Sequence, residues 1–308
     1  MQWIGRTSLY IFFIFSTTYC YASNSIAHKQ LAFHSQPRFH DLPQLLKDRQ
    51  ITVLVVNHPA YYFLAHSRPR GIAYDMMREY ESIINNYYFR DSKLKLNIIF
   101  KPVASAEIID LLEQGQGDIA IGPLIPTKQD KDKVTFTNAL YNDHRLILLS
   151  HNATQTYQDI AQLAGKAIWV RRNSIYHHKL LEINQQIIAQ QKQPITINLV
   201  GAEIEDYELL DMLDNQQIFM TMISSHSMRL WKKIYRNIKI HSELVIENDL
   251  ASNWAVQKDT PKLLASLNRF IKNHKKGSKL GNILHRRYLV THPWLNKIFY
   301  EKFEQRYR

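Results

Sequence analysis

The feature that most constrains the fold is a short apolar run, Ile-Ala-Ile at residues 119–121, enclosed by Asp118 and Gly122. A run this short and this apolar is typical of a strand buried on both faces, as in a parallel sheet. A polar, lysine-rich loop follows and leads to Tyr141. Open α/β sheets bind their ligands beyond the carboxyl ends of such strands. We therefore predict a ligand-binding loop after Gly122.

The preceding residues alternate between strand and helix patterns. The apolar run 51–56 predicts a strand, and Gly71 precedes a helix with apolar residues at i, i+3 and i+4. Residues 94–103 predict a second strand, and Ser105 is suited to cap a helix over 106–113. This β-α-β-α-β order implies parallel pairing with right-handed crossovers.

A second α/β series of about the same size follows Tyr141. It comprises predicted strands at 146–149, 166–170, 195–200 and 218–223, and predicted helices at 157–163, 174–188 and 204–213. Ser174 is a natural N-cap for the middle helix. The chain then passes through 254–256 into helices at 261–275 and 280–288. We predict two α/β lobes in succession.

The N-terminus has the pattern of a secretory signal peptide over 1–22. Arg6 supplies the positive region, residues 9–15 the apolar core, and Ala22 the cleavage site. Residues 23–42 are polar and unpatterned, and we predict a flexible N-terminus there. Cys20 is the only cysteine, so the mature protein would have no thiol chemistry. We expect a periplasmic protein exported across the inner membrane.

The formal net charge is +12, and most of it lies near the C-terminus. Residues 267–308 contain eleven Lys or Arg against two Glu, which is a net charge of nine. Apolar side chains at helical spacing predict a basic, aromatic helix over 291–308. In an exported protein such a tail would meet the cell wall or an anionic membrane surface rather than nucleic acid. A solvated helical tail is an equally good interpretation.

Sequence motifs for catalysis are absent. There is no G-x-S-x-G, Walker or G-x-G-x-x-G motif, and no histidine has H-E-x-x-H spacing. Neighbouring His177 and His178 would point about 100° apart on a helix and could not chelate together. Glu205 and Asp206 are expected on a solvated helix face. We predict no enzyme activity, no catalytic residue, no metal and no cofactor.

The order of these segments resembles that of the family 3 extracellular solute-binding proteins, over about residues 43–290. Within that family the chain is most similar to the N-terminal module of membrane-bound lytic transglycosylase F. The resemblance is carried by the segments 51–53 and 57–62, 71–75, 117–120 with Thr127, Val134 and Phe136, 163–166 with Ser174, 254–258, 267–270, Lys276-Gly277 and Arg287-Tyr288.

The resemblance implies a type II periplasmic binding protein, in which two Rossmann-like lobes close on a small-molecule ligand. Lobe 1 would comprise 43–145 plus 251–290, and lobe 2 would comprise 146–250. In lytic transglycosylase F a catalytic domain follows this module, whereas this sequence stops at Arg308. We therefore expect no muramidase activity.

The resemblance also identifies candidate ligand contacts, among them Gly122, Thr127 and, in lobe 2, Ser224. Amino-acid binders of the family place an arginine three residues later, where this chain has Asp130, and an aspartate in lobe 2, where it has Ser224. Losing one partner of a buried charge pair costs about 2–5 kcal/mol of binding free energy. Ordinary zwitterionic amino acids are therefore poor candidates, although a shift of the alignment would bring Lys128 or Lys131 to that position.

Other groups could replace the missing anchors. Asn173 and Ser174 stand at a predicted helix N-terminus, which can offer N–H groups to an anion, and Arg171 and Arg172 stand beside them. Tyr61 and Tyr62 could stack on a ring. We hypothesise an anionic ligand or a cell-wall fragment, with simple surface charge as the competing interpretation of the arginines.

Three functions remain open for this protein, which we expect to be a monomer. The first is a solute receptor that delivers its ligand to an ABC permease. The second is a non-transport module that senses the cell wall or regulates a partner. The third is a binding protein whose pocket has degenerated.

Overall fold

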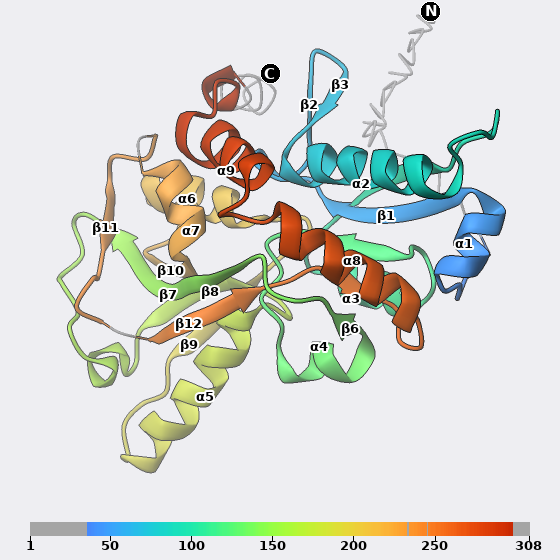
Figure 1. Ribbon diagram of the computed structural model, residues 1–308. Helices are drawn as coiled ribbons and strands as arrows, with labels where there is room; N and C mark the ends of the chain where they lie inside the picture. Colours follow the sequence, from blue (N-terminus) through green and yellow to red (C-terminus); the bar gives the residue numbers. More distant parts are fainter. Residues whose placement is uncertain (1–35, 233, 245, 298–308) are drawn as a thin grey trace, which may run out of the picture. The chain divides into compact units, whose positions relative to one another are not determined.

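The computed structural model describes residues 36–297 except 233 and 245, and two sheets organise them (Figure 1). The first sheet has the order β4-β1-β5-β13-β6, with β1 parallel to both β4 and β5 and β13 antiparallel to β5. Its strands are β1 (Gln50–Val56), β4 (Asn97–Val103), β5 (Ile119–Ile121), β6 (Thr135–Phe136) and β13 (Ala255–Val256). The predicted parallel β-α-β-α-β unit is confirmed.

Alternation along β1 gives the first sheet two apolar faces. Val53 and Val55 pack in one cluster with α1 (Leu42–Asp48), α2 (Ile72–Tyr88) and α8 (Pro261–His274). Leu54 and Val56 belong to a separate cluster with α3 (Ile108–Glu113). Because helices cover both faces, the strands read as continuous apolar runs in the sequence.

The second sheet has the order β11-β7-β10-β8-β9, and β12 also pairs with β7. Its strands are β7 (Tyr141–His151), β8 (Ala167–Arg171), β9 (Thr196–Val200), β10 (Met220–Ser224), β11 (Ile238–Ile240) and β12 (Glu247–Ser252). Its helices are a 3-10 turn (Ile160–Leu163), α5 (Ile175–Ala189), α6 (Asp206–Asp214) and α7 (Ser225–Trp231). The two sheets and their helices form the two lobes.

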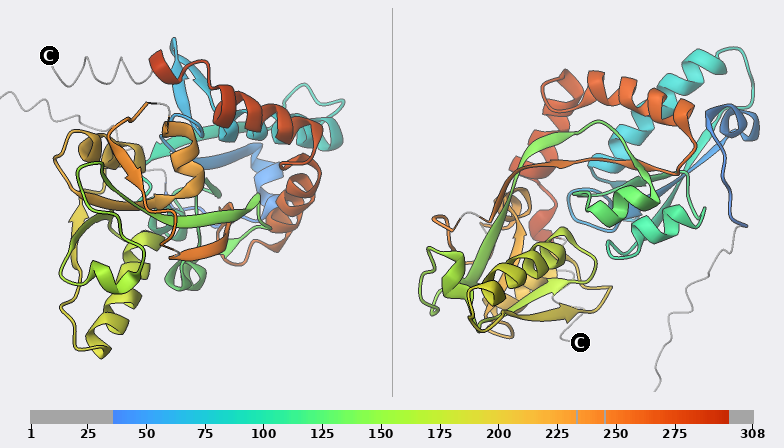
Figure 2. Two further views of the ribbon diagram at one scale, coloured as in Figure 1. Left: turned by 90° about the vertical axis from the view of Figure 1, so that its left-hand side faces the viewer. Right: turned by 90° about the horizontal axis from the view of Figure 1, so that it is seen from below.

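Strands β7 and β12 carry the chain between the lobes. They pair antiparallel from Glu247 opposite Leu146 to Ser252 opposite Tyr141, and they lie side by side in Figure 2. The chain leaves the first sheet before β7 and rejoins it at β13 after β12. The two crossings therefore form one hinge of two adjacent strands.

A glycine fixes the turn that follows β1. Gly71 has φ = 121°, and a Cβ there would lie 2.2 Å from the Tyr61 carbonyl oxygen. The close approach lets Ile72 N–H donate to the Ala60 carbonyl at 2.9 Å. Strands β2 (Phe63–Ala65) and β3 (Arg68–Arg70) form a hairpin between this turn and α2. Ala60 and Tyr61, although they follow β1 of lobe 1 in the chain, pack in the apolar core of lobe 2.

The structure differs from the sequence predictions at several element boundaries. Helix α3 begins at Ile108 with Glu107 as its N-cap, so the predicted cap at Ser105 is wrong. Strand β4 begins at Asn97 rather than at residue 94, and only a 3-10 turn stands in place of the helix predicted at 157–163. Near the C-terminus, α9 (Lys279–His285) continues into a π-helix (Arg286–Thr291).

The termini lie largely beyond the described residues. The signal peptide predicted at 1–22 falls outside them, as does most of the C-terminal helix predicted at 291–308. Of the N-terminus predicted to be flexible, the described part is held in place: Arg38 N–H donates to the Gly115 carbonyl at 3.0 Å, and its guanidinium pairs with Asp118 at 2.9 Å. None of the helices in the described ranges is long and apolar enough to cross a bilayer.

Candidate functional site

The candidate site is a cavity of about 300 Å³ lined by both lobes. Lobe 1 contributes Ser105 before α3, residues 123–126 after β5, and side chains of α4 (Lys128–Lys133). Lobe 2 contributes residues 171–176, at the end of β8 and the start of α5. The cavity therefore lies at the carboxyl ends of parallel strands, where ligands bind in open α/β sheets.

Arg171 holds the lobe 2 wall of this cavity together. It is the last residue of β8 and is 8% exposed, and its Nε donates to Asp206 Oδ1 at 2.7 Å. The hydroxyl of Tyr176 donates to the other oxygen of Asp206 at 2.9 Å. Burial by itself lowers the pKa of Arg171, but Asp206 and Glu205 raise it overall, so the guanidinium stays charged. Asp206 already engages that guanidinium.

Glu205 links the two lobes directly. Its Oε1 accepts a hydrogen bond from Ser105 N–H at 2.9 Å, and its Oε2 accepts one from the Ser105 hydroxyl at 2.7 Å. Burial raises the pKa of this carboxyl, partly offset by Arg171 and Ser105. The prediction that Glu205 and Asp206 lie on a solvated face is wrong, since they are 7% and 4% exposed.

The N-terminus of α5 borders the cavity. Ser174 is its N-cap and accepts from His177 N–H at 3.2 Å. Asn173 precedes it in the left-handed region, at φ = 57°. Arg172 is exposed, lines the cavity, and has no ion pair within the described residues. First-turn N–H groups of a helix lack intrahelical acceptors and favour anions.

On the lobe 1 side, Thr127 and Asp130 are joined by two reciprocal hydrogen bonds between side chain and backbone. Asp130 N–H donates to the Thr127 hydroxyl at 3.1 Å, and Asp130 Oδ2 accepts from Thr127 N–H at 2.9 Å. This capping box starts α4 and gives a physical reason for an aspartate at this position. Asp130 lines the cavity, whereas Thr127 is buried behind it. Lys133 on the same helix pairs with Asp110 at 2.5 Å.

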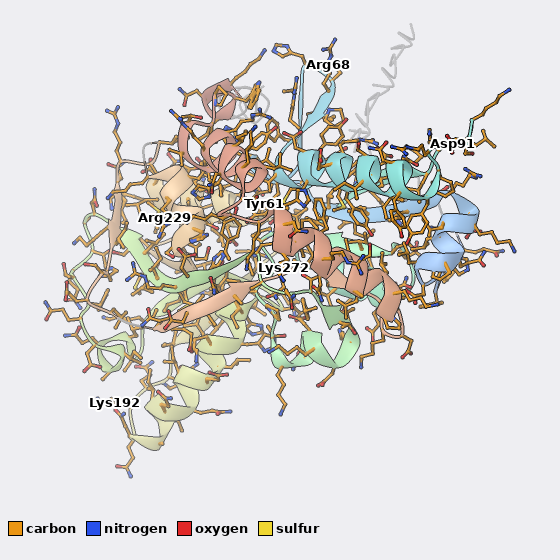
Figure 3. All side chains as sticks on the ribbon, in the orientation of Figure 1. Tyr61, Arg68, Asp91, Lys192, Arg229 and Lys272 are labelled. Carbon is orange, nitrogen blue, oxygen red and sulfur yellow. The ribbon has the colours of Figure 1, made fainter. Side chains whose placement is uncertain are left out.

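At the inner end of the cleft, side chains fill the space between the lobes. Only about 10 Å³ remains there, bordered by residues that include Tyr61, Ser224 and Leu289. Tyr61, labelled in Figure 3, is 8% exposed, and burial raises its pKa far above the usual range. Ser224 is the N-cap of α7, and its N–H donates to the Tyr176 hydroxyl at 3.1 Å.

The remaining two predicted residues lie within lobe 1. Tyr62 stacks on Phe100 with ring centroids 5.6 Å apart, in the cluster that contains α2. Gly122 packs against Val56: a Cβ added to Gly122 would lie 2.6 Å from Val56 Cγ2. Of the eight predicted ligand contacts, the structure thus brings Arg171, Asn173 and Ser174 to the cavity. Their contact with a ligand stays a prediction.

Two buried histidines lie where hinge strand β7 meets α7. His144 and His226 have ring centroids 3.9 Å apart, and His226 Nε2 lies 2.8 Å from Asp143 Oδ1. Burial and then His226 lower the pKa of His144 to about 3. Within the part of the chain that the structure describes, no three His, Cys, Asp or Glu residues are arranged to hold a metal ion.

The sequence model of the bacterial extracellular solute-binding proteins, family 3, matches residues 51–290, which include most of both lobes and every residue that lines the cavity. The chain belongs to this family. Solved structures agree: one substrate-binding protein of an amino acid ABC transporter superposes with a TM-score of 0.62 at 19% identity, covering 78% of this chain and 98% of its own. A Streptococcus pneumoniae amino acid ABC transporter substrate-binding protein bound to L-arginine gives 0.62 at 15% identity, covering 81% and 99%. The predicted two-lobe, type II binding-protein fold is confirmed.

Curated relatives of this family 3 chain are larger. The membrane-bound lytic murein transglycosylase F of Desulfosudis oleivorans is 25% identical over 269 residues, which are 86% of this chain and 55% of the relative. The homologous protein of Pseudomonas fluorescens is 24% identical, over 80% of this chain and 48% of its own length. The chain thus spans about half the length of the curated relatives that it matches, and the predicted resemblance to lytic transglycosylase F is confirmed.

Sequence reasoning missed the contacts made by Glu205, Asp206 and Ser105. Glu205 and Asp206 immediately precede and begin α6, where acidic residues are common for helix-capping reasons alone. Only the position of β8 beside β9 and of lobe 1 across the cleft turns them into partners of Arg171 and Ser105. No local sequence pattern distinguishes the two cases.

Proposed function

We propose that this family 3 protein is a periplasmic receptor for a small polar ligand that carries an anionic group. The cavity of about 300 Å³ between the lobes is the observation that carries the proposal. Small-molecule sites in proteins are concave and converge a few polar groups on the ligand. A groove that both lobes line can also couple binding to closure of the hinge.

The charge around the cavity supports an anion placed against lobe 2. Arg171 is satisfied by Asp206 and Lys133 by Asp110, so these four charges cancel in pairs. Arg172, beside the N-terminus of α5, is the cation of the wall without such a partner among the described residues. On the opposite wall, Asp130 would repel an α-carboxylate where amino-acid binders carry an arginine. An ordinary zwitterionic amino acid therefore fits this cavity poorly.

Isothermal titration of the purified protein tests the proposal. We expect muropeptides or other anionic cell-wall fragments to bind, and ordinary amino acids to bind weakly. Arg172→Ser should weaken binding, because it removes the cation without an ion pair, whereas Lys192→Ser should not. Tight binding of an ordinary amino acid, or equal affinity of both variants, would contradict the proposed ligand class.

A second function is favoured by the filled inner end of the cleft. Tyr61 and Leu289 occupy space between the lobes, and Glu205 accepts two hydrogen bonds from Ser105 of the other lobe. These contacts suit a non-transport module, either one that senses the cell wall or one whose pocket has degenerated. Ligand-dependent thermal stabilisation separates a degenerate pocket from the other functions, because binding to the folded state raises its stability. Acceleration of uptake through an ABC permease would then separate a transport receptor from a sensor.

A further inference from the structure

A second cavity lies in lobe 2, away from the cleft between the lobes. Its volume is about 230 Å³, and none of its lining residues lines the candidate site. The cavity borders β7, α7 and the loop between β11 and β12. It is thus built from lobe 2 together with residues 145–147 and Asn248 of the two strands that form the hinge.

An interrupted sheet edge creates this cavity. Strand β7 pairs with β11 from residue 149 to 151 and with β12 from residue 146 down to 141. Ser242 and Leu244, from the described part of the loop that joins these two partners, line the space beside that gap. Leu146 and Ile147 of β7 and Ile240 of β11 line the resulting hollow, and α7 closes one side of it with Met228.

The floor of the cavity is apolar. Leu146, Met228 and Leu244 are each at most 3% exposed and still border the hollow, so their side chains offer apolar surface at its base. An apolar floor of this kind favours an apolar guest, since filling the hollow adds dispersion contacts.

The rim is cationic. Arg145, Arg229 and Lys232 all line the cavity, all are exposed, and no ion pair engages any of them within the described residues. No carboxylate belongs to the lining. Of the acids nearby, Glu247 pairs with Lys179 at 2.5 Å, Glu243 is exposed outside the lining, and Asp143 lies beside His226. Arg229, labelled in Figure 3, also interacts electrostatically with Asp143, but beyond ion-pair distance.

We infer that this cavity binds an anion with an apolar body, with the body against Leu146, Met228 and Leu244 and the anionic head among Arg145, Arg229 and Lys232. A carboxylate or phosphate head on an aliphatic or aromatic body has the required chemistry. Such a molecule could be a free fatty-acid-like carboxylate or a single anionic lipid. This site is independent of the function proposed for the cleft.

Three probes of graded chemistry test the inference by isothermal titration. Decanoate carries both the head and the body, decanol only the body, and acetate only the head. We expect decanoate to bind most tightly. The double variant Arg229→Ser/Lys232→Ser should weaken decanoate about 2- to 30-fold, since each exposed charge contact contributes modestly, and should leave decanol unchanged. Ser242→Trp, at the rim, should obstruct both.

Matched controls locate the site. The double variant Lys192→Ser/Lys272→Ser removes the same charge from exposed positions elsewhere, both labelled in Figure 3, and should bind decanoate as the wild type does. Arg172→Ser should also leave decanoate unchanged, because Arg172 belongs to the cleft. Thermal unfolding midpoints of all variants show that each is folded.

The inference is overturned if decanoate fails to bind at millimolar concentration, if acetate binds as well as decanoate, or if Arg229→Ser/Lys232→Ser has no effect. Loss of decanoate binding in Arg172→Ser would place the guest in the cleft and would also overturn it.

Co-sedimentation with phosphatidylglycerol vesicles distinguishes the two possible sources of the ligand, an anionic lipid and a free carboxylate. Binding that depends on Arg229 and Lys232 identifies a lipid, whereas binding of monomeric decanoate alone identifies a free carboxylate.

Discussion

The two ends of the cleft between the lobes differ in what fills them. At the outer end a cavity of about 300 Å³ is lined by polar side chains and the start of α5. At the inner end about 10 Å³ remains, because Tyr61, Leu289 and the hinge histidines occupy the space. The comparison teaches that this chain fills the space between its lobes with its own side chains at one end. At the other end it leaves room for a ligand, beside the hydrogen bonds by which Ser105 and Glu205 join the lobes.

The largest effect is expected at the buried ion pair behind the outer cavity. Arg171→Ala should lower the free energy of unfolding by about 3–5 kcal/mol, because it leaves Asp206 as an uncompensated buried charge. The neighbouring Arg172→Ala should change it by less than about 0.5 kcal/mol, because Arg172 is exposed. Urea denaturation of both variants measures the difference. Equal effects would show that Arg171 does not support the outer wall.

A similar effect is expected from the residue that fills the inner end. Tyr61→Ala should cost about 3 kcal/mol, the lower end of the range for buried aromatic side chains, since Tyr61 is 8% exposed. It should also enlarge the inner cavity, which a crystal structure of the variant would show. Tyr87→Ala is the control, because Tyr87 is 78% exposed and should be almost neutral. A neutral Tyr61→Ala would mean that the inner end is not packed as described.

The bridge across the cleft should have a smaller effect. Ser105→Ala removes one of the two hydrogen bonds to the Glu205 carboxylate and should cost about 1.5 kcal/mol, the lower end for bonds to a charged group. Small-angle scattering should also show a larger radius of gyration, as the lobes lose a contact. Unchanged stability and scattering together would argue that Glu205 does not hold the lobes.

The smallest effect is expected from acidification, which should lower the free energy of unfolding through His144 at the inner end of the cleft. The folded state lowers the pKa of His144 to about 3, whereas an unfolded histidine titrates near 6.5. The unfolded chain therefore binds more protons below pH 6.5, and stability falls as pH falls. His144 alone should account for about 1 kcal/mol between pH 6.5 and 5.5.

Other titratable groups also affect how stability changes with pH. Burial also lowers the pKa of His226 and His285, which adds to the loss, while Asp143 favours and Arg229 and Lys276 oppose protonation of His226. Elsewhere in the molecule, burial raises the pKa of Glu205 and Asp118, which opposes the loss. Urea denaturation from pH 7.5 to 5.5 measures the slope, and His144→Asn should flatten it. A slope that is the same in this variant would contradict the assignment.

The sequence by itself determined the alternation of strands and helices. Apolar runs such as residues 119–121 predict buried parallel strands wherever they occur, because a strand covered on both faces needs apolar residues at every position. The helix start after Gly71 and the N-cap at Ser174 were likewise predictable, since both depend on residues nearby in the chain. The position of the cleft followed from the same local rules and from the resemblance to family 3 proteins.

Only the tertiary structure determined which side chains meet at the cleft, either within one lobe or across it. Arg171 and Asp206 lie 35 residues apart, and Ser105 and Glu205 lie 100 apart. Whether an acidic residue at a helix start is solvated or buried depends on what another lobe places against it, and no local pattern records that. For the same reason Tyr61 could be identified as an aromatic at a strand end, but its burial in the other lobe could not.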